Sequence, residues 1–265
     1  MTTSSDDQSF YSEDLIAKLE LRWGEGFLSP GGAEELALML EGVPVHDATV
    51  LDFGCGTGGI DVLLAREHGA GKVVGVDIEP LVLEHAAKRV ADAGLSDRIT
   101  FQRVNEAPLP LRDGDFEVVF TKDSIVHIAD KQSLFADFWR LLWPGGYLVL
   151  GDWFRSAEPY TEEMRRWATE GDETFEMGTL ADAADLAARA GFEGIETVDR
   201  NEWFQDYAQA EYDRITGPLW QEYVARFGEE GARASAENSR IRALLAKQGQ
   251  LRPGHLRARK ALAAA

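Results

Sequence analysis

The stretch Val50-Leu-Asp-Phe-Gly-Cys-Gly-Thr-Gly-Gly59 has the pattern of a strand, a tight turn and the start of a helix. Val50 to Phe53 is a largely apolar run, which predicts a buried strand. Four glycines then predict a tight turn, and helical spacing resumes at Ile60. This order is typical of the nucleotide-binding unit of a parallel α/β sheet, where the helix N-terminus offers N–H groups to a ligand.

A carboxylate next to the glycines indicates which ligand this turn prefers. Gly54-x-Gly56-x-x-Gly59 also fits the dinucleotide pattern, so the glycines alone leave a nicotinamide or flavin site open, as well as a turn without a ligand. Asp52 precedes the first glycine by two residues and would repel a diphosphate. It would attract S-adenosylmethionine, which carries a sulfonium and an ammonium but no phosphate. The run Asp52-x-Gly-x-Gly-x-Gly therefore resembles the first motif of class I S-adenosylmethionine-dependent methyltransferases.

Composition narrows the class of protein. With 265 residues, 45% of them hydrophobic, the chain is long enough for one α/β domain with additions. Its net charge of −19 disfavours a nucleic-acid partner, because phosphate contacts need clustered basic residues. The basic residues between 252 and 260 are expected on a solvated face of a final strand.

The single cysteine and the N-terminal residues carry further expectations. Cys55 excludes internal disulfides and a cysteine-based metal site, and it is interpreted as a packing residue. No metal is expected. The first nine residues have neither a basic region nor an apolar core, so no signal peptide is expected, and no run approaches a membrane span. We expect a cytoplasmic protein without a membrane or obligate protein partner.

Strand and helix patterns alternate along the chain. Strands are expected over 50–53, 72–78, 99–104, 116–121, 147–153, 194–199 and, at an edge, 255–262. Helices are expected over 10–23, 33–40, 60–68, 80–93, 131–142, 162–169, 180–190, 203–227 and 229–247. This order predicts a Rossmann-like, doubly wound, mostly parallel seven-stranded α/β sheet, with an N-terminal helical lid and a helical insertion before the last strand.

The same pattern suggests how the chain is organised. Residues 1–9 are expected to be a disordered tail, and residues 10–265 one methyltransferase domain. Within it, we expect a helical lid over 10–46, a cofactor-binding half over 47–155, and substrate-side helices and last strands over 156–265.

Polar residues follow several of the expected strands, where ligands lie in such sheets. They are Asp52, Asp77, Asn105-Glu106, Lys122-Asp123 and Asp152-Trp153. Asp77 can accept two ribose hydroxyls, and Asn105 can meet an adenine amino group or be a turn residue. Asp123 can hold the ammonium of the cofactor or the substrate. His127 lies four residues further on, where catalytic and structural roles are both open.

The wider sequence resembles the phosphobase methyltransferases, notably the phosphoethanolamine N-methyltransferases, and is similar to the sarcosine/dimethylglycine methyltransferases. Its specific features are Tyr11 with the run to Gly24, Phe27-Leu-Ser-Pro-Gly-Gly32, and Lys122-Asp-Ser-Ile-Val-His-Ile128. The resemblance implies that Tyr11 and His127 act as a catalytic dyad. It implies cofactor contacts for Leu28, Ser29, Asp52, Gly54, Gly56, Asp77, Ile78, Asn105, Glu106 and Lys122. It implies substrate contacts for Asp123, Trp153, Arg155 and Asp172.

Departures from this family concern the phosphate clamp. Trp153 stands where the family has a phosphate-binding tyrosine, residues 171–175 read Gly-Asp-Glu-Thr-Phe, and the C-terminal phosphate lysine falls near Ile241. Arg155, Arg240 or Arg242 could compensate. We therefore expect methyl transfer to the nitrogen of a small polar amine or amino acid. The alternatives are transfer to S, O or C, a nicotinamide-binding oxidoreductase, and a non-catalytic binding protein.

Overall fold

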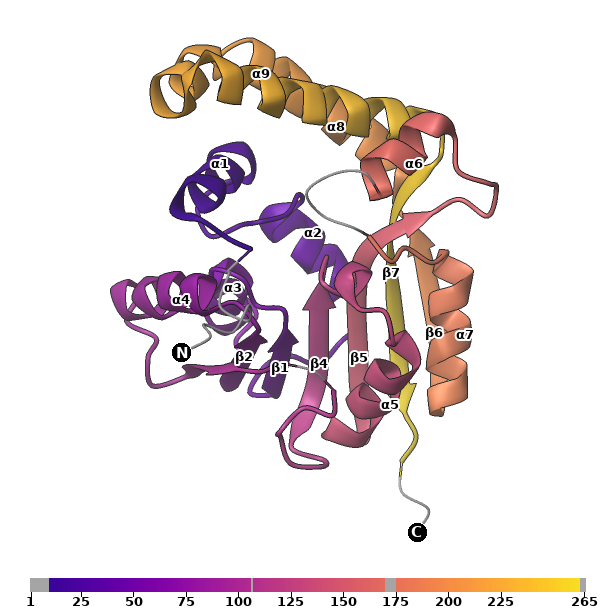
Figure 1. The fold of residues 1–265 in the computed structure, drawn as a ribbon. Helices are drawn as coiled ribbons and strands as arrows, with labels where there is room; N and C mark the ends of the chain where they lie inside the picture. The colour runs from indigo at the N-terminus through magenta and orange to yellow at the C-terminus, as the bar shows by residue number, and fades with distance from the viewer. Residues whose placement is uncertain (1–9, 106, 170–174, 263–265) are drawn as a thin grey trace, which may run out of the picture. The chain divides into compact units, whose positions relative to one another are not determined.

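The structure is a computed structural model that describes residues 10–105, 107–169 and 175–262. The chain groups into two compact units, Met1–Leu111 and Arg112–Ala265 (Figure 1). Among the described residues, no helix combines the length and the apolar character needed to cross a bilayer. Nor do the described His, Cys, Asp and Glu side chains include a group of three or more placed to hold a metal ion.

The first unit contains three parallel strands in the order β3-β2-β1. They are β1 (Thr49–Phe53), β2 (Lys72–Asp77) and β3 (Ile99–Arg103). The helices are α1 (Glu13–Trp23), α2 (Gly32–Met39), α3 (Gly59–Arg66) and α4 (Pro80–Asp92). Val50, Leu51, Val73 and Val76 are fully buried, as expected for strands with near-continuous apolar runs. Pro80 occupies the first turn of α4, where its missing N–H costs no helical hydrogen bond.

The second unit contains four strands in the order β4-β5-β7-β6. They are β4 (Phe116–Lys122), β5 (Leu142–Arg155), β6 (Phe192–Asp199) and β7 (Leu251–Lys260). The short 3-10 helix η1 (Ile125–His127) follows β4, and the α-helices are α5 (Lys131–Leu141), α6 (Glu162–Thr169), α7 (Leu180–Ala190), α8 (Asn201–Thr216) and α9 (Trp220–Lys247). β4 and β5 are parallel, whereas β7 is antiparallel to both β5 and β6. The predicted seven-stranded, mostly parallel α/β fold class is confirmed.

Two expectations about the last strands need correction. β7 is not an edge strand, because it pairs along its length with β5 and with β6, and β6 forms the edge of this unit. β5 starts at Leu142 rather than at Tyr147. Residues 143–146, which lie between the expected helix and the expected strand, belong to it, and its register with β4 shifts between Phe116 and Val118. The basic residues of β7 are engaged by the surrounding protein: Arg252 pairs with Asp199.

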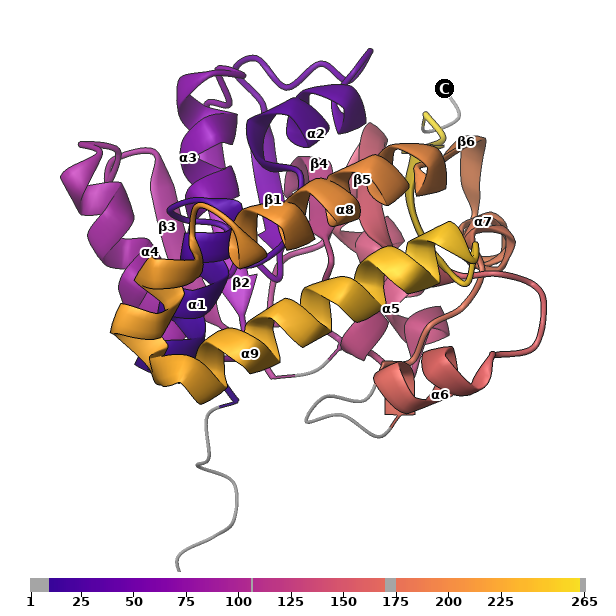
Figure 2. The ribbon, with the colours of Figure 1, turned by 90° about the horizontal axis from the view of Figure 1, so that it is seen from above.

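The helical insertion lies between β6 and β7, as predicted, and it has one break more than expected. The expected helix over 203–227 is divided, because α8 ends at Thr216 and α9 begins at Trp220. The expected boundary at residue 228 is a kink in α9, where Gly228 has non-helical φ/ψ (φ 73°, ψ 170°) and separates two helical segments. α8 and α9 pack along each other, with Phe204 and Ala208 in the cluster that also contains Leu245 (Figure 2).

Candidate functional site

The glycine turn leads directly from β1 into α3. The N–H groups of Gly54 and Cys55 both donate to the carbonyl of Val76, which attaches the turn to β2. Gly56 has a φ of 53°, a conformation that L side chains rarely adopt. At Gly59 a Cβ atom would lie 2.3 Å from the carbonyl oxygen of Gly26, so only glycine allows these two segments to approach.

Asp77, at the end of β2, holds the other side of this turn. Its Oδ2 accepts a hydrogen bond from the Gly56 N–H at 3.0 Å, and its Oδ1 accepts one from the Glu79 N–H at 3.0 Å. Burial raises the pKa of Asp77, while these backbone N–H groups partly oppose the change. A carboxylate fixed in this way can accept ribose hydroxyls, as predicted. Ile78, the next residue, is 52% exposed and offers an apolar side chain at the same strand end.

Arg89 of α4 connects α1 and the segment after it to the glycine turn. Its Nε donates to the Thr57 carbonyl at 2.9 Å, and its terminal nitrogens pair with Glu20 at 2.7 Å and Glu25 at 3.1 Å. Nearby, a Cβ atom on Gly56 would lie 3.2 Å from Leu28 Cδ1. The segment that contains Leu28 and Ser29 is thereby held beside the turn, as its predicted cofactor role requires. Sequence patterns gave no signal for Arg89.

The carboxyl groups of Asp52, Asp61 and Asp77 lie close to the thiol of Cys55, which is part of the turn. Asp52 and Asp61 are buried, with 2% and 0% of their surface exposed. Burial raises the pKa of Asp61 to about 7. Burial, followed by the charges of Asp61, Asp52 and Asp77, also raises the pKa of the Cys55 thiol, so this cysteine is a poor nucleophile. This environment suits a cationic ligand and opposes a diphosphate, which agrees with the inference from Asp52.

Three further predicted site residues belong to the first unit: Tyr11, Asn105 and Glu106. Tyr11 precedes α1, and its ring lies edge-on to Phe10, 5.2 Å between centroids. The Phe10 N–H donates to Glu79 at 3.0 Å, so Phe10 and its neighbour Tyr11 lie near the loop after β2. Asn105 follows β3 and is exposed. Glu106 lies outside the described residues.

In the second unit, the end of β4 carries a buried ion pair. Lys122 Nζ donates to Asp123 Oδ2, and the two side chains are 7% and 10% exposed. Asp123 has a φ of 54°, unusual for a residue other than glycine, and its N–H donates to the Gly151 carbonyl at 2.8 Å. The two residues predicted to contact cofactor and substrate are therefore partners of each other.

His127 is the last residue of η1, in the turn that follows this pair. Its imidazole is exposed to solvent on one side and lies against Phe175 on another, with 5.6 Å between ring centroids. The surrounding protein lowers its pKa by desolvation; the Asp123 charge opposes this change and Lys131 adds to it. An imidazole that is neutral near pH 7 can accept a proton. His127 therefore meets the chemical requirement of a general base.

Aromatic residues surround Trp153, which was predicted to contact the substrate. Its indole lies 6.2 Å from the ring of Trp167 and 5.0 Å from that of Phe204, edge-on to the latter. Trp167 in turn stacks on Phe175 at 4.9 Å. A continuous row of rings thus extends from His127 to Trp153. Asp172, also predicted to contact substrate, lies outside the described residues.

The arginines that could rebuild a phosphate clamp have other partners. Arg242 is buried and pairs with Glu211 of α8, and its Nη2 also lies 3.1 Å from Ser239 Oγ. Arg240 is bidentate to Glu237, at 2.8 and 2.7 Å. The Arg155 guanidinium lies over Tyr160, 5.5 Å from its centroid, and donates to the Ser156 carbonyl at 3.0 Å. Each of these three cations thus has a contact within the second unit.

Comparison with known proteins assigns this architecture to a class. Residues 50–146, which contain the glycine turn and β4, match the family described as "Methyltransferase domain". With the turn and its carboxyl environment, this match identifies residues 50–146 as a class I S-adenosylmethionine-dependent methyltransferase domain.

Within that class, the chain is similar to phosphoethanolamine N-methyltransferases. It is 28% identical over 225 residues to phosphoethanolamine N-methyltransferase 1 of Arabidopsis thaliana, covering 84% of this chain and 45% of that protein. The structure of phosphoethanolamine N-methyltransferase 2 from Haemonchus contortus, in complex with phosphomonomethylethanolamine and S-adenosylhomocysteine, aligns with a TM-score of 0.90 and 24% identity, covering 98% of this chain and 62% of that one. A putative sarcosine dimethylglycine methyltransferase from Galdieria sulphuraria aligns with a TM-score of 0.74 and 21% identity, covering 96% and 91%. The chain thus spans about half the length of the plant relative.

We expect S-adenosylmethionine to raise the melting temperature of this protein, and NAD, NADP and FAD to leave it unchanged. At 100 times its dissociation constant, a ligand adds ~2.7 kcal/mol to the free energy of unfolding. Asp77→Ala should lose most of this stabilisation, because the ribose hydroxyls and the Gly56 N–H lose their acceptor. Thermal scans with each ligand measure the effect, and Asp92→Asn, on the exposed surface of α4, is the control. A shift with NAD alone would contradict the assignment of the turn.

Proposed function

We propose that this protein transfers the methyl group of S-adenosylmethionine to the nitrogen of a small polar amine. The observation that carries this proposal is His127, whose pKa is lowered by its surroundings and which follows Asp123 at the end of β4. A carboxylate that attracts an ammonium and an imidazole that accepts its proton are the two groups that an amine acceptor needs. The similarity to phosphoethanolamine N-methyltransferases supports the same choice.

The acid–base chemistry explains why a nitrogen acceptor needs such a residue. An alkylammonium of pKa ~10.4 must lose a proton before its lone pair can attack, which costs roughly 4 kcal/mol near neutral pH. A positioned general base commonly contributes ~10²–10⁴ in rate. S-adenosylmethionine supplies the electrophilic methyl group, and the protein supplies orientation, desolvation and a proton acceptor. We propose His127 as that acceptor, with Tyr11 contributing to the same step.

The tail of the acceptor is proposed to be neutral or singly charged, as in an amino acid, a partly methylated glycine or a neutral-tailed amine. The row of rings from Phe175 to Trp153 offers apolar surface, and Arg242 is already paired with Glu211. Incubation of a panel of amines with an isotopically labelled methyl donor, followed by product mass spectrometry, tests the proposal. Labelled thioether, ether or carbon-methylated products in place of N-methyl products would overturn it.

We expect His127→Ala and Tyr11→Phe to lower turnover at least tenfold while S-adenosylmethionine still binds. Each substitution removes a group proposed to deprotonate or orient the ammonium, and neither residue supplies the acceptors of the glycine turn. Steady-state kinetics and calorimetric titration of the cofactor measure the two effects separately. If both variants keep near wild-type turnover, the base lies elsewhere or the acceptor, like a thioether, needs none.

A further inference from the structure

The carboxyl group of Asp152 binds the turn that carries His127. Asp152 lies within β5, just past the residues that pair with β4, and is 2% exposed. Its Oδ2 accepts hydrogen bonds from the N–H groups of Ile125, at 2.7 Å, and Val126, at 3.2 Å. Its Oδ1 accepts one from the Trp153 N–H, at 2.6 Å. One side chain therefore satisfies the N–H groups at the start of η1 and fixes this turn to β5.

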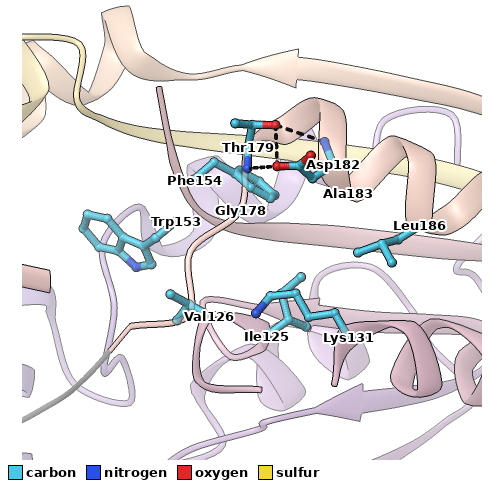
Figure 3. A pocket seen from close by; sticks show the side chains of 10 residues that line it. All are labelled: Ile125, Val126, Lys131, Trp153, Phe154, Gly178, Thr179, Asp182, Ala183 and Leu186. Atoms are coloured by element: carbon cyan, nitrogen blue, oxygen red, sulfur yellow. Dashed lines mark hydrogen bonds between the residues drawn. The ribbon is translucent and has the colours of Figure 1, made fainter. Parts of the chain in front are cut away.

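The side chains of the same turn are buried: Ile125 and Val126 are each 2% exposed, and Val126 belongs to a hydrophobic cluster with Met164 and Met177. Ile125 and Val126 also line a small hollow of about 20 Å³, whose other walls include Trp153 and Leu186 (Figure 3). Figure 3 shows Lys131 at one side of this hollow, and its ammonium donates to the carbonyls of Ile128 and Glu176, each at 2.6 Å.

Another contact fixes the opposite end of the turn. The Glu176 N–H donates to the Val126 carbonyl at 2.8 Å, which places Phe175 against the His127 ring. Val126 is thus held through its N–H by Asp152 and through its carbonyl by the backbone at Glu176. The backbone bond is independent of side-chain identity, whereas the bonds to Asp152 depend on one carboxyl group.

We propose that Asp152 is a positioning residue for methyl transfer, which orients the η1 turn so that Asp123 and His127 present their side chains to the acceptor amine. This inference rests on the proposed role of His127. The carboxyl itself does not need to touch substrate, because it is buried and its oxygens face backbone N–H groups. Burial, followed by the charge of Asp123, raises the pKa of Asp152 to about 8. The protonation of Asp152 therefore depends on the charge of Asp123.

The test compares Asp152→Asn with Asp137→Asn. Asp137 is another buried aspartate of the same unit, but it pairs with Arg140 on α5, away from η1. For Asp152→Asn we expect turnover at least tenfold lower, with the S-adenosylmethionine dissociation constant within threefold of wild type. We also expect the imidazole pKa of His127 to rise by at least half a unit, toward its ordinary value, as the turn loosens. Asp137→Asn should change neither turnover nor this pKa.

Histidine proton signals in NMR titrations, assigned with His127→Ala, measure the pKa without any acceptor, so they distinguish this inference from the proposed function. An unchanged His127 pKa in a folded Asp152→Asn protein would overturn the positioning role. Asp152→Ala is a second variant should the amide fail to fold. A shifted pKa with no methyl transfer to any amine would contradict the proposed function and leave the positioning of the turn supported.

Discussion

Phosphoethanolamine should be a poor substrate of this protein, with kcat/KM at least a hundredfold below that of sarcosine or dimethylglycine. A phosphate monoester is close to a dianion at neutral pH, and its recognition needs several charge-assisted hydrogen bonds. Each such bond contributes ~1.5–3 kcal/mol. Loss of two of them corresponds to roughly two to four decades in affinity.

The partners of the local cations explain why these bonds are missing. Arg242, one of the two arginines that flank Ile241 at the expected lysine position, is 5% exposed and bound to Glu211 across the α8–α9 contact. To reach a phosphate, it would leave Glu211 buried without its counter-ion, which typically costs ~3–5 kcal/mol. Arg240 is exposed and bidentate to Glu237, and Trp153 is packed among rings. The acidic residues at 172 and 173, which prompted the same expectation from sequence, lie outside the described residues.

Competition kinetics with phosphoethanolamine against the two glycine derivatives measures this preference. Trp153→Tyr introduces the hydroxyl that the family resemblance implies at this position, and it should raise the ratio of phosphoethanolamine to sarcosine turnover. Trp167→Tyr, in the neighbouring ring of the same row, is the matched control and should not raise it. A clear preference of the wild-type protein for phosphoethanolamine would show that Arg155, Arg240 or Arg242 rearranges to bind the phosphate.

The fold followed from sequence because its signals are local. The glycine turn, Asp77 at the end of β2 and Pro80 at the start of α4 each depend on residues within one short stretch. Backbone preferences and the strand-end rule are sufficient for such features. The helices α6 (Glu162–Thr169) and α7 (Leu180–Ala190) were also predicted at their observed bounds for this reason.

Features that depend on partners distant in sequence were not predictable. The sequence of β7 does not indicate that this strand pairs on both sides. Its place between β5 and β6 depends on how the whole chain is connected, not on its own residues. The pairing of Arg242 with Glu211 joins residues 31 positions apart on two helices. Asp152 was identified as a strand-end residue, but its role requires knowing that η1 folds back onto it. Tyr11 and His127 remain predictions for catalysis.

Asp61 is the remaining residue that sequence reasoning missed, and its burial has a measurable consequence. It lies in the first turn of α3, where an aspartate ordinarily caps N–H groups at the surface, but here it is fully buried. A Cβ atom on Gly75 would lie 2.8 Å from its Oδ1 and 2.6 Å from the Phe101 ring, so its surroundings are tightly filled. Burial makes ionisation of this carboxyl unfavourable in the folded protein without cofactor, and the charge of Asp77 adds to the effect.

We therefore expect Asp61→Asn to stabilise the cofactor-free protein, and to do so increasingly as pH rises. The folded-state pKa is raised from 3.8 to about 7, so below pH ~4 both folded and unfolded Asp61 are protonated and the residue has no effect. Between those values the unfolded chain ionises first, so wild-type stability falls as pH rises, and above about pH 7 the loss is complete. Three pKa units correspond to ~4 kcal/mol, an upper bound because Asp52 shares the effect.

Urea denaturation of both proteins at pH 4.5, 6 and 8 measures this difference, with the exposed Asp97→Asn as the control whose effect should not vary with pH. The amide is nearly isosteric with the carboxyl, so a gain in stability that increases from pH 4.5 through pH 6 to pH 8 isolates the ionisation of Asp61 from packing. Equal effects of Asp61→Asn at all three pH values, or a loss at pH 8, would show that the carboxylate is stabilised by its neighbours.

In the wild-type protein, the cost of ionising Asp61 should be reduced when a cationic cofactor binds beside the glycine turn, since a positive charge nearby lowers the pKa of a carboxyl. The stabilisation by S-adenosylmethionine should accordingly be larger at pH 8 than at pH 6 in the wild type, and independent of pH over this range in Asp61→Asn.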